Sequence, residues 1–192
     1  MWMVRSVVSR IHLEEAARIL HRGGLIAYPT EAVYGLGCLP WERRAVERLL
    51  EVKNRSWRKG LSLIAASLEQ LEPLVEFPTG ALAEELRLSW PGPFTWVLNA
   101  RPGIPYWLTG GRDTLAVRVT GHALSRRLCE AAASPLISTS ANRSGRPPLR
   151  RILHVRREFG AGVDYVLAGE LGGPGNPTMI RDGLTGAVLR TA

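Results

Sequence analysis

The segment LIAYPTEAVYGLG, residues 25–37, sets the expected fold. Its first four residues are apolar and precede Pro29, a pattern that predicts a short buried strand ending at the proline. Thr30 comes directly after this strand, and ligands of α/β proteins gather where strands end at their carboxyl side. The glycines later in the segment allow close approach of a second backbone or a ligand. The segment therefore predicts a ligand-binding loop; the alternative is a tight turn in which Thr30 bonds its own backbone.

On both sides of this segment, apolar spacing predicts further helices and strands. Helical spacing predicts helices over residues 13–20, 42–53, 67–74, 79–88 and 122–133. Short apolar runs predict strands over residues 25–28, 61–65, 94–98, 114–119, 136–139, 165–167, 178–180 and 187–189. Helices separate some of these strands and short turns separate others, so the expected fold is α/β, with parallel and antiparallel pairs in a mixed sheet. We expect one domain over residues 1–192.

The charge of the chain points to anionic partners. The formal net charge is +8 and the calculated pI is about 10.5, with Lys53 and Lys59 as the only lysines. Arginine presents a planar, permanently charged fork that suits phosphate and carboxylate groups. A basic chain of this kind is expected to meet nucleotides or RNA. The alternative is that arginine simply replaces lysine on an ordinary solvated surface.

The cysteines and the hydropathy indicate the cellular compartment of the protein. Cys38 and Cys129 lie far apart in sequence and form no CxxC pair, which suits a reducing compartment. No apolar run approaches the roughly 20 residues of a membrane span, and the first five residues have no apolar signal core. We therefore expect a cytoplasmic protein.

Common nucleotide and metal signatures are incomplete in this chain. Gly35 and Gly37 lack the third glycine of a dinucleotide fingerprint, and the glycine-rich residues 172–175 lack the Lys-Ser/Thr of a P-loop. The four histidines have no metal-site spacing. A nucleotide must therefore be held in another way, and no metal site built by protein side chains is expected.

A cationic segment, KNRSWRKG, covers residues 53–60 at the end of a predicted helix. Cations at a helix C-terminus oppose the negative end of its dipole, and they are often merely solvated. The functional interpretation is a triphosphate clamp, with Lys53 as a point charge and Arg55 as a bidentate fork.

A hydroxyl-rich segment, STSANRSG, covers residues 138–145 and follows an apolar strand. Ser138, Ser140 and Asn142 place hydroxyls and an amide at alternating positions, which suits binding to phosphate oxygens. Serine-rich turns also commonly bond their own backbone, which is the structural alternative.

Together and in this order, these segments resemble the YrdC-like family, in particular its short-form L-threonylcarbamoyladenylate synthases (TsaC). The resemblance runs from about residue 13 to residue 190. The motifs that carry it are AYPTEAVYGLGC, KNRSWRKGLSLIAA, WPGPFTWVL, LAVRVTGH, STSANRSGRPP and GNPTMIRDGLTGAVLR. It implies an open, twisted sheet with flanking helices and a basic concavity. It also implies synthesis of threonylcarbamoyl-AMP from L-threonine, bicarbonate and ATP, with release of pyrophosphate, for modification of tRNA.

The resemblance also implies roles for particular residues. Lys53 and Arg55 would be catalytic. The expected ATP ligands are Lys53, Arg55, Ser140, Asn142 and Arg190. The expected threonine ligands are Thr30, Arg118, Ser138 and Thr178. Mg²⁺ is expected on the substrate phosphates rather than in a protein cage. Separate proteins would transfer the threonylcarbamoyl group onward, and tRNA is a possible ligand of the basic concavity.

The chain departs from the family pattern in small ways. Ser56 stands where many relatives have proline, which suggests a more flexible loop, and Thr178 replaces a common serine while keeping the hydroxyl. The sequence ends soon after Arg190, so no lid from a C-terminal domain is assumed. Two alternatives stay open: a non-catalytic module that binds tRNA or rRNA, and a paralogue of the same fold with a different carbamoyl or amino-acid substrate.

Overall fold

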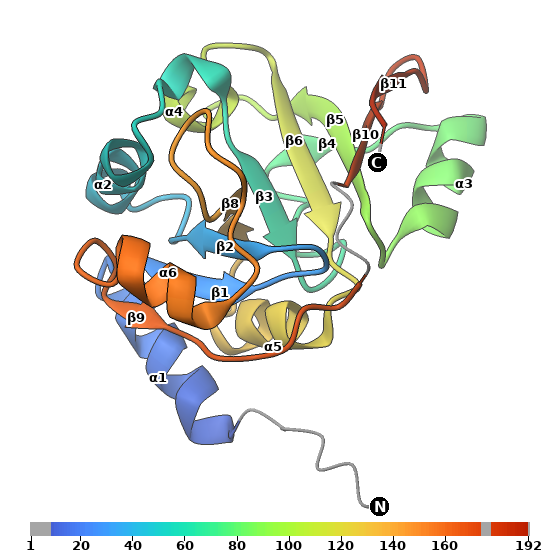
Figure 1. Ribbon diagram of the computed structural model, residues 1–192. Coiled ribbons are helices and arrows are strands. Elements are labelled where there is room, and N and C mark those ends of the chain that lie inside the picture. The colour runs from blue at the N-terminus through green and yellow to red at the C-terminus, as the bar shows by residue number, and fades with distance from the viewer. Residues whose placement is uncertain (1–8, 174–177, 192) are drawn as a thin grey trace, which may run out of the picture.

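The computed structural model describes residues 9–173 and 178–191 (Figure 1). The start of the chain, used above to exclude a signal core, and residues 175–177 of the last family motif lie outside these ranges. The helices are α1 (Arg10–His21), α2 (Arg43–Lys53), α3 (Gly80–Ser89), α4 (Tyr106–Thr109), α5 (Ala123–Ala131) and α6 (Ile152–Phe159), with a 3₁₀ turn η1 (Trp57–Lys59).

The strands are short and are spread along the whole chain. They are β1 (Ile26–Pro29), β2 (Tyr34–Gly37), β3 (Ser62–Ala65), β4 (Val75–Glu76), β5 (Phe94–Ala100), β6 (Thr114–Val119), β7 (Leu136–Ile137), β8 (Thr139–Ser140), β9 (Tyr165–Val166), β10 (Met179–Asp182) and β11 (Val188–Arg190). The expected α/β class with flanking helices is confirmed.

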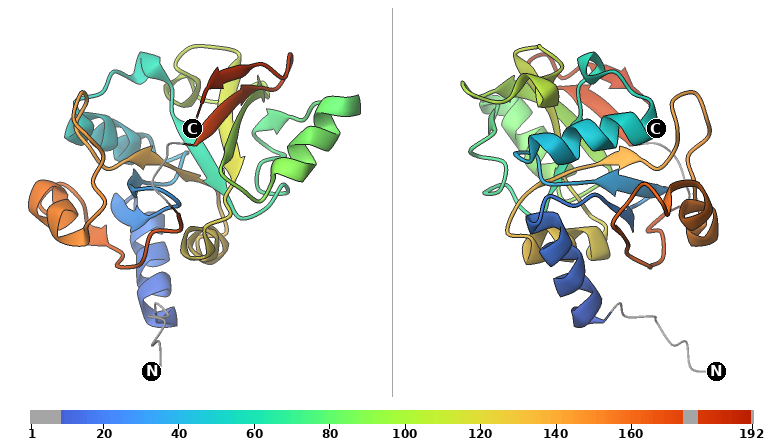
Figure 2. Two further views of the ribbon diagram at one scale, coloured as in Figure 1. Left: turned by 45° about the vertical axis from the view of Figure 1, so that its right-hand side comes forward. Right: turned by 90° about the vertical axis from the view of Figure 1, so that its left-hand side faces the viewer.

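The strands form two sheets, a division that the sequence patterns did not indicate. The smaller sheet has the order β8-β2-β1-β9, and the larger has the order β11-β10-β5-β6-β3-β7 (Figure 2). Each sheet contains both parallel and antiparallel pairs, as expected. The predicted strand 136–139 is divided, because β7 belongs to the larger sheet and β8 to the smaller. Ser138 therefore lies where the chain crosses between the two sheets.

The predicted amphipathic faces form the core. In α1 the buried residues are Leu13, Ala16, Ala17 and Leu20, the same set whose spacing predicted the helix. In α2 they include Ala45, Val46, Leu49 and Leu50. Helices α1 and α5 pack together beside β1, while α2 and α3 lie on other sides of the sheets (Figures 1 and 2). These helices fix the strand ends from which the polar loops project.

The expected helix over residues 67–74 is wrong, because this segment forms consecutive turns. Pro73 has no N–H to continue a helical ladder. The side chain of Gln70 accepts from the Ala66 N–H at 2.9 Å and donates to the Cys129 carbonyl at 3.0 Å. One local and one tertiary hydrogen bond of Gln70 thus hold the segment in place of a helical repeat.

Substitution of Gly37 by alanine should destabilise the fold, because β2 passes very close to β7 at this position. A Cβ there would collide with the Ile137 carbonyl oxygen and would lie 2.9 Å from Tyr28 Cε1. Forced repacking of this kind costs about 1–3 kcal/mol, measurable as a lower free energy of unfolding in urea. Gly121→Ala is the matched control, because its nearest neighbour would lie at an ordinary 3.4 Å. Equal stability of the two variants would contradict the packing described.

Candidate functional site

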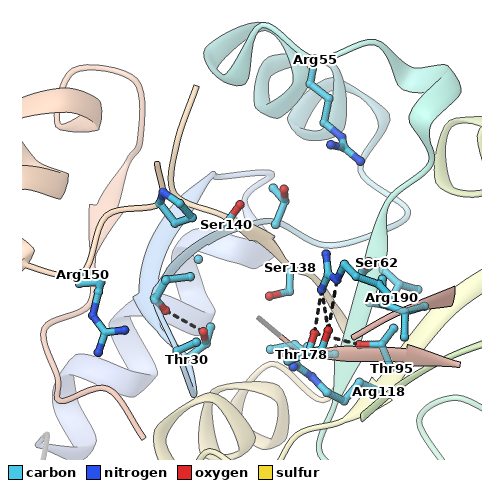
Figure 3. Close-up of a pocket in the computed structure, with 18 residues that line it drawn as sticks. Thr30, Arg55, Ser62, Thr95, Arg118, Ser138, Ser140, Arg150, Thr178 and Arg190 are labelled. Atoms are coloured by element: carbon cyan, nitrogen blue, oxygen red, sulfur yellow. Dashed lines mark hydrogen bonds between the residues drawn. The ribbon is translucent and has the colours of Figure 1, made fainter. Parts of the chain in front are cut away.

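A cavity of about 460 Å³ lies between the two sheets (Figure 3). Its volume falls within the range of roughly 300–1,000 Å³ typical of small-molecule sites. The polar and charged lining residues are Thr30, Arg55, Ser62, Thr95, Arg118, Ser138, Thr139, Ser140, Arg150, Thr178 and Arg190. All the predicted site residues except Lys53 and Asn142 therefore line one cavity.

Arg118 lies at one end of the cavity, on β6. The residue is only 6% exposed, and its Nη2 lies 3.4 Å from a carboxylate oxygen of Glu31. Its Nε and Nη1 are buried without a hydrogen-bond partner. Because an unpaired buried guanidinium nitrogen is costly, these donors are suited to an anion entering the cavity.

Thr178 and Arg190 lie beside Arg118 at the same end of the cavity (Figure 3). Arg190 Nη2 donates to the Thr178 carbonyl at 2.7 Å and lies 3.3 Å from its hydroxyl. Burial and the neighbouring Arg118 charge lower the pKa of Arg190. Thus β6 and β11 bring two cations together beside threonine hydroxyls, which favours a carboxylate-sized anion.

The Thr30 loop forms a neighbouring wall. The Thr30 hydroxyl donates to the Val33 carbonyl at 2.7 Å, as in the tight-turn interpretation, although the residue also lines the cavity. A Cβ on Gly35 would lie 3.2 Å from Thr30 Cγ2 and 3.5 Å from Ser138 Oγ. The glycine therefore lets β2 pass close behind both hydroxyl residues.

Arg55 occupies the opposite end of the cavity and points into it (Figure 3). Helix α2 ends at Lys53 and is capped by Asn54, whose left-handed conformation turns the chain so that Arg55 leaves the helix axis. Arg55 Nη2 donates to the Gly60 carbonyl at 2.9 Å, while its Nε is buried and unpartnered. Burial also lowers the pKa of Arg55.

Lys53 lies beneath the serine-rich loop rather than on the cavity surface. It is 3% exposed, and its ammonium donates to the Ser140 carbonyl and, at 2.7 Å, to the Asn142 carbonyl. The Asn142 side chain is engaged within the same loop: its Oδ1 accepts from the Ser140 hydroxyl at 2.6 Å and its Nδ2 donates to the Arg146 carbonyl at 2.6 Å. Lys53, Ser140 and Asn142 therefore lie together, and Lys53 and Asn142 contact each other and Ser140.

Ser62, Thr95, Thr139 and Arg150 also line the cavity and were not among the predicted site residues. Ser62 and Thr95 are hydroxyl residues inside otherwise apolar strands, a signal that the sequence did contain. Arg150 follows the family motif that ends at residue 148, and no periodic pattern marks it. Its placement depends on the path of the loop between β8 and α6.

Among the residues that the structure describes, the lining is cationic and contains no carboxylate. Arg55, Arg118, Arg150 and Arg190 all belong to it. Across residues 9–173 and 178–191, no group of three or more His, Cys, Asp or Glu side chains is placed to hold a metal. In the same ranges, none of the helices is long and apolar enough to span a bilayer. The cavity thus suits anionic ligands rather than a metal held by carboxylates.

The stability of the protein should depend on pH through Lys53. Burial, together with the nearby Arg55 charge, lowers the pKa of Lys53 to about 8. An unfolded lysine has a pKa of about 10.4, so in the intervening range the unfolded chain holds a proton that the folded chain has released. The free energy of unfolding should therefore rise with pH in this window. The test is urea unfolding of wild type and Lys53→Met. The stability of wild type relative to the variant should increase between about pH 8 and about pH 10, whereas a constant difference would contradict the burial.

Comparisons with known proteins match this arrangement over nearly the whole chain. The profile of the Sua5/YciO/YrdC family, described as "Telomere recombination", matches residues 18–192. A protein of Nitrosococcus oceani named threonylcarbamoyl-AMP synthase is 52% identical over 175 residues, covering 91% of this chain and 95% of that protein.

Two solved structures share the fold. Sua5 of P. abyssi, complexed with L-threonine, superposes with a TM-score of 0.89 at 35% identity, covering 97% of this chain and 56% of the longer one, so this chain spans just over half of that protein. E. coli YciO superposes with a TM-score of 0.80 at 25% identity, covering 95% of this chain and 89% of that one. Because the family profile matches residues 18–192 and relatives of similar length are about half identical to this sequence, the chain belongs to the Sua5/YciO/YrdC family.

Proposed function

We infer that this chain is a threonylcarbamoyl-AMP synthase, a nucleotidyltransferase that supplies activated threonylcarbamate for the modification of tRNA. The observation that carries this conclusion is the close full-length similarity to curated synthases, together with a single cavity that has arginines at both ends. The substrates are L-threonine, bicarbonate and ATP. The fold alone supports many activities, so the assignment rests on the site and on these relatives.

We propose that the cavity has a threonine end and a phosphate end. Arg118, with its free buried donors, pairs with the threonine carboxylate, and Thr30, Ser138 and Thr178 surround the rest of the amino acid. A binding site for threonine in this fold is supported by the P. abyssi Sua5 complex. Hydrogen bonds from an arginine to a carboxylate provide both charge neutralisation and orientation.

At the phosphate end, Arg55 and Ser140 contact the triphosphate of ATP. Lys53 and Asn142 belong to the same proposed site. In the present geometry their bonds hold the Ser140 loop, and a phosphate oxygen reaches the Lys53 ammonium by replacing one of its carbonyl partners. Arg190, close to Arg118 at the other end, is proposed as a further ATP ligand where the nucleotide meets the threonine.

The proposed chemistry needs positioning more than covalent catalysis. The threonine amine forms an N–C bond with carbon dioxide or bicarbonate and loses a proton, with water leaving in the bicarbonate case. An oxygen of this carbamate attacks the α-phosphorus of ATP. The bond from the α-phosphorus to the bridging oxygen breaks, and pyrophosphate leaves. Arg55 offsets the negative charge that accumulates on the leaving phosphates.

Mg²⁺ is proposed to enter with ATP. The cavity lining offers hydroxyls but no carboxylate, so the side chains do not suit a resident metal cage. We also propose that the enzyme acts in the cytoplasm and that separate proteins pass the threonylcarbamoyl group to tRNA.

Mass spectrometry of the reaction mixture tests the activity. The protein is mixed with ATP, Mg²⁺, threonine and bicarbonate, and the labile adenylate is trapped quickly. Threonylcarbamoyl-AMP and pyrophosphate should form in equal amounts, and omission of threonine or bicarbonate should prevent both. Binding of RNA without any ATP consumption would favour the non-catalytic module instead.

Amino-acid selectivity is a further expected property of the threonine end. Serine lacks the methyl group of threonine, and one missing methyl in an apolar pocket lowers the specificity constant by about 10- to 200-fold. Competition between labelled threonine and serine should therefore show a strong preference with measurable use of serine. Equal use of glycine and threonine would contradict a pocket shaped for the threonine side chain.

A further inference from the structure

Glu31 lies in the Thr30 loop, directly after Thr30, yet it does not line the cavity. Its side chain is 16% exposed, and its Oε2 lies 3.4 Å from Arg118 Nη2. Its Oε1 accepts a hydrogen bond from the Thr120 hydroxyl at 2.7 Å. Thr120 thus holds the carboxylate against Arg118, and Glu31 is not part of the cavity lining.

Thr120 fixes this carboxylate in one orientation. The residue is fully buried and follows Arg118 by two positions, at the end of β6. Its hydroxyl oxygen accepts from the His122 backbone N–H at 3.2 Å, so its single proton is available for Glu31. The His122 N–H, the Thr120 hydroxyl and the Glu31 carboxylate therefore form a chain of polar groups that ends at the guanidinium of Arg118.

The charges explain why Arg118 needs such support. Arg118 and Arg190 lie beside each other at one end of the cavity (Figure 3), and burial, followed by the Arg118 charge, lowers the pKa of Arg190. Without a neighbouring anion, the two cations would tend to separate, and a long arginine side chain can turn toward water. Glu31 offsets part of this repulsion, and it does so without occupying the face of Arg118 that carries the unpartnered Nε and Nη1.

We propose that Glu31, held by Thr120, is a positioning residue that orients Arg118 for the carboxylate of threonine. This inference rests on the proposed synthase function. Glu31 touches neither substrate. Glu31 contributes to threonine binding only through its effect on Arg118. An ion pair that merely stabilised the fold would have no such specific effect on threonine binding.

Conservative variants separate these two roles. Glu31→Gln keeps the size of the side chain and an acceptor for Thr120, but it loses the charge. We expect the KM and the Kd for threonine to rise at least about tenfold, comparable with loss of one charged hydrogen bond between Arg118 and the threonine carboxylate. The KM for ATP should rise much less, because Arg55 and Ser140 are unaltered. Thr120→Val should give a smaller rise in the same constants, and Thr120→Ser, which keeps the hydroxyl, should restore wild-type values.

A double-mutant cycle with Arg118→Ala completes the test. If Glu31 acts through Arg118, Glu31→Gln should leave threonine binding in the Arg118→Ala background unchanged. Thermal unfolding identifies variants that fail to fold. If Glu31→Gln fails to fold, the comparison of threonine Kd between Thr120→Val and Thr120→Ser tests the proposal instead. The proposal is overturned by a wild-type Kd for threonine in Glu31→Gln, by equal losses with and without Arg118, or by parallel increases in the KM values for ATP and threonine.

The readouts distinguish this proposal from the proposed function. Threonine binding is measured by calorimetry without turnover, and adenylate formation by mass spectrometry. Normal coupling between Glu31 and Arg118 with no adenylate from wild type would reject the synthase assignment alone. Adenylate formation with no coupling would reject the role of Glu31 alone.

Discussion

Replacement of Arg55 by alanine is expected to lower threonine-dependent pyrophosphate release by about 10²- to 10³-fold, the usual effect of removing a donor that stabilises transition-state charge. Arg55 is the arginine at the phosphate end whose guanidinium points into the cavity (Figure 3). Its guanidinium has a buried Nε without a hydrogen-bond partner, and its charge can offset that of a phosphate in the cavity. Steady-state pyrophosphate release at saturating threonine measures this effect, because the loss should fall mainly on kcat.

Arg58 provides a matched control on the same segment. It is exposed and stacks over the Trp57 ring at 4.8 Å, and it does not line the cavity. Arg58→Ala removes the same charge a few residues away, so it should retain near wild-type turnover. Similar losses in both variants would mean that the net charge of the loop, rather than the position of Arg55, supports the reaction. Wild-type turnover in Arg55→Ala would reject the phosphate-contact assignment.

Substitution of Arg118 by lysine is expected to weaken threonine capture while the charge is kept. Lysine lacks the planar fork of arginine and is not a conservative replacement at a carboxylate site. Loss of a charged hydrogen bond of about 1.5–3 kcal/mol predicts a rise in the threonine KM of roughly 10- to 150-fold. The KM for ATP should change little, because Arg55 and Ser140 are unaltered at the other end of the cavity.

Arg126 is the control for this second substitution. It forms an exposed ion pair with Glu130 at 3.6 Å on α5, and exposed pairs contribute little to stability. Arg126→Lys should leave both KM values unchanged. An unchanged threonine KM in Arg118→Lys would show that the carboxylate is held elsewhere, and an equal rise in both KM values would indicate general damage to the cavity.

Local patterns predicted the elements whose apolar residues pack in a regular way. The buried faces of α1 and α2 follow helical spacing, and β6 covers the same six residues, 114–119, that its pattern predicted. Helix α6, residues 152–159, was not predicted, since its only buried residues, Val155 and Phe159, are set in an arginine-rich surface. A local bond from Ala66 to Gln70 and a tertiary bond from Gln70 to Cys129 explain the failed helix at 67–74.

The site was predictable as a set of motifs but not in its detailed contacts. The family resemblance implied that Arg55, Arg118 and Ser140 belong to one site, and the structure places all three in the lining of one cavity. It did not indicate that Lys53 would bond to the carbonyls of the distant serine loop. Such contacts depend on the crossing between the two sheets at Ser138, which no local pattern encodes. The assigned roles of these residues stay predictions.

A crystal structure with L-threonine and a non-hydrolysable ATP analogue tests most directly whether one cavity holds both substrates. The threonine carboxylate should lie on Arg118, and the triphosphate should lie on Arg55 and Ser140, with the α-phosphate between the two ends. A nucleotide bound on another surface, with Arg55 and Ser140 free of phosphate, would contradict the proposed site.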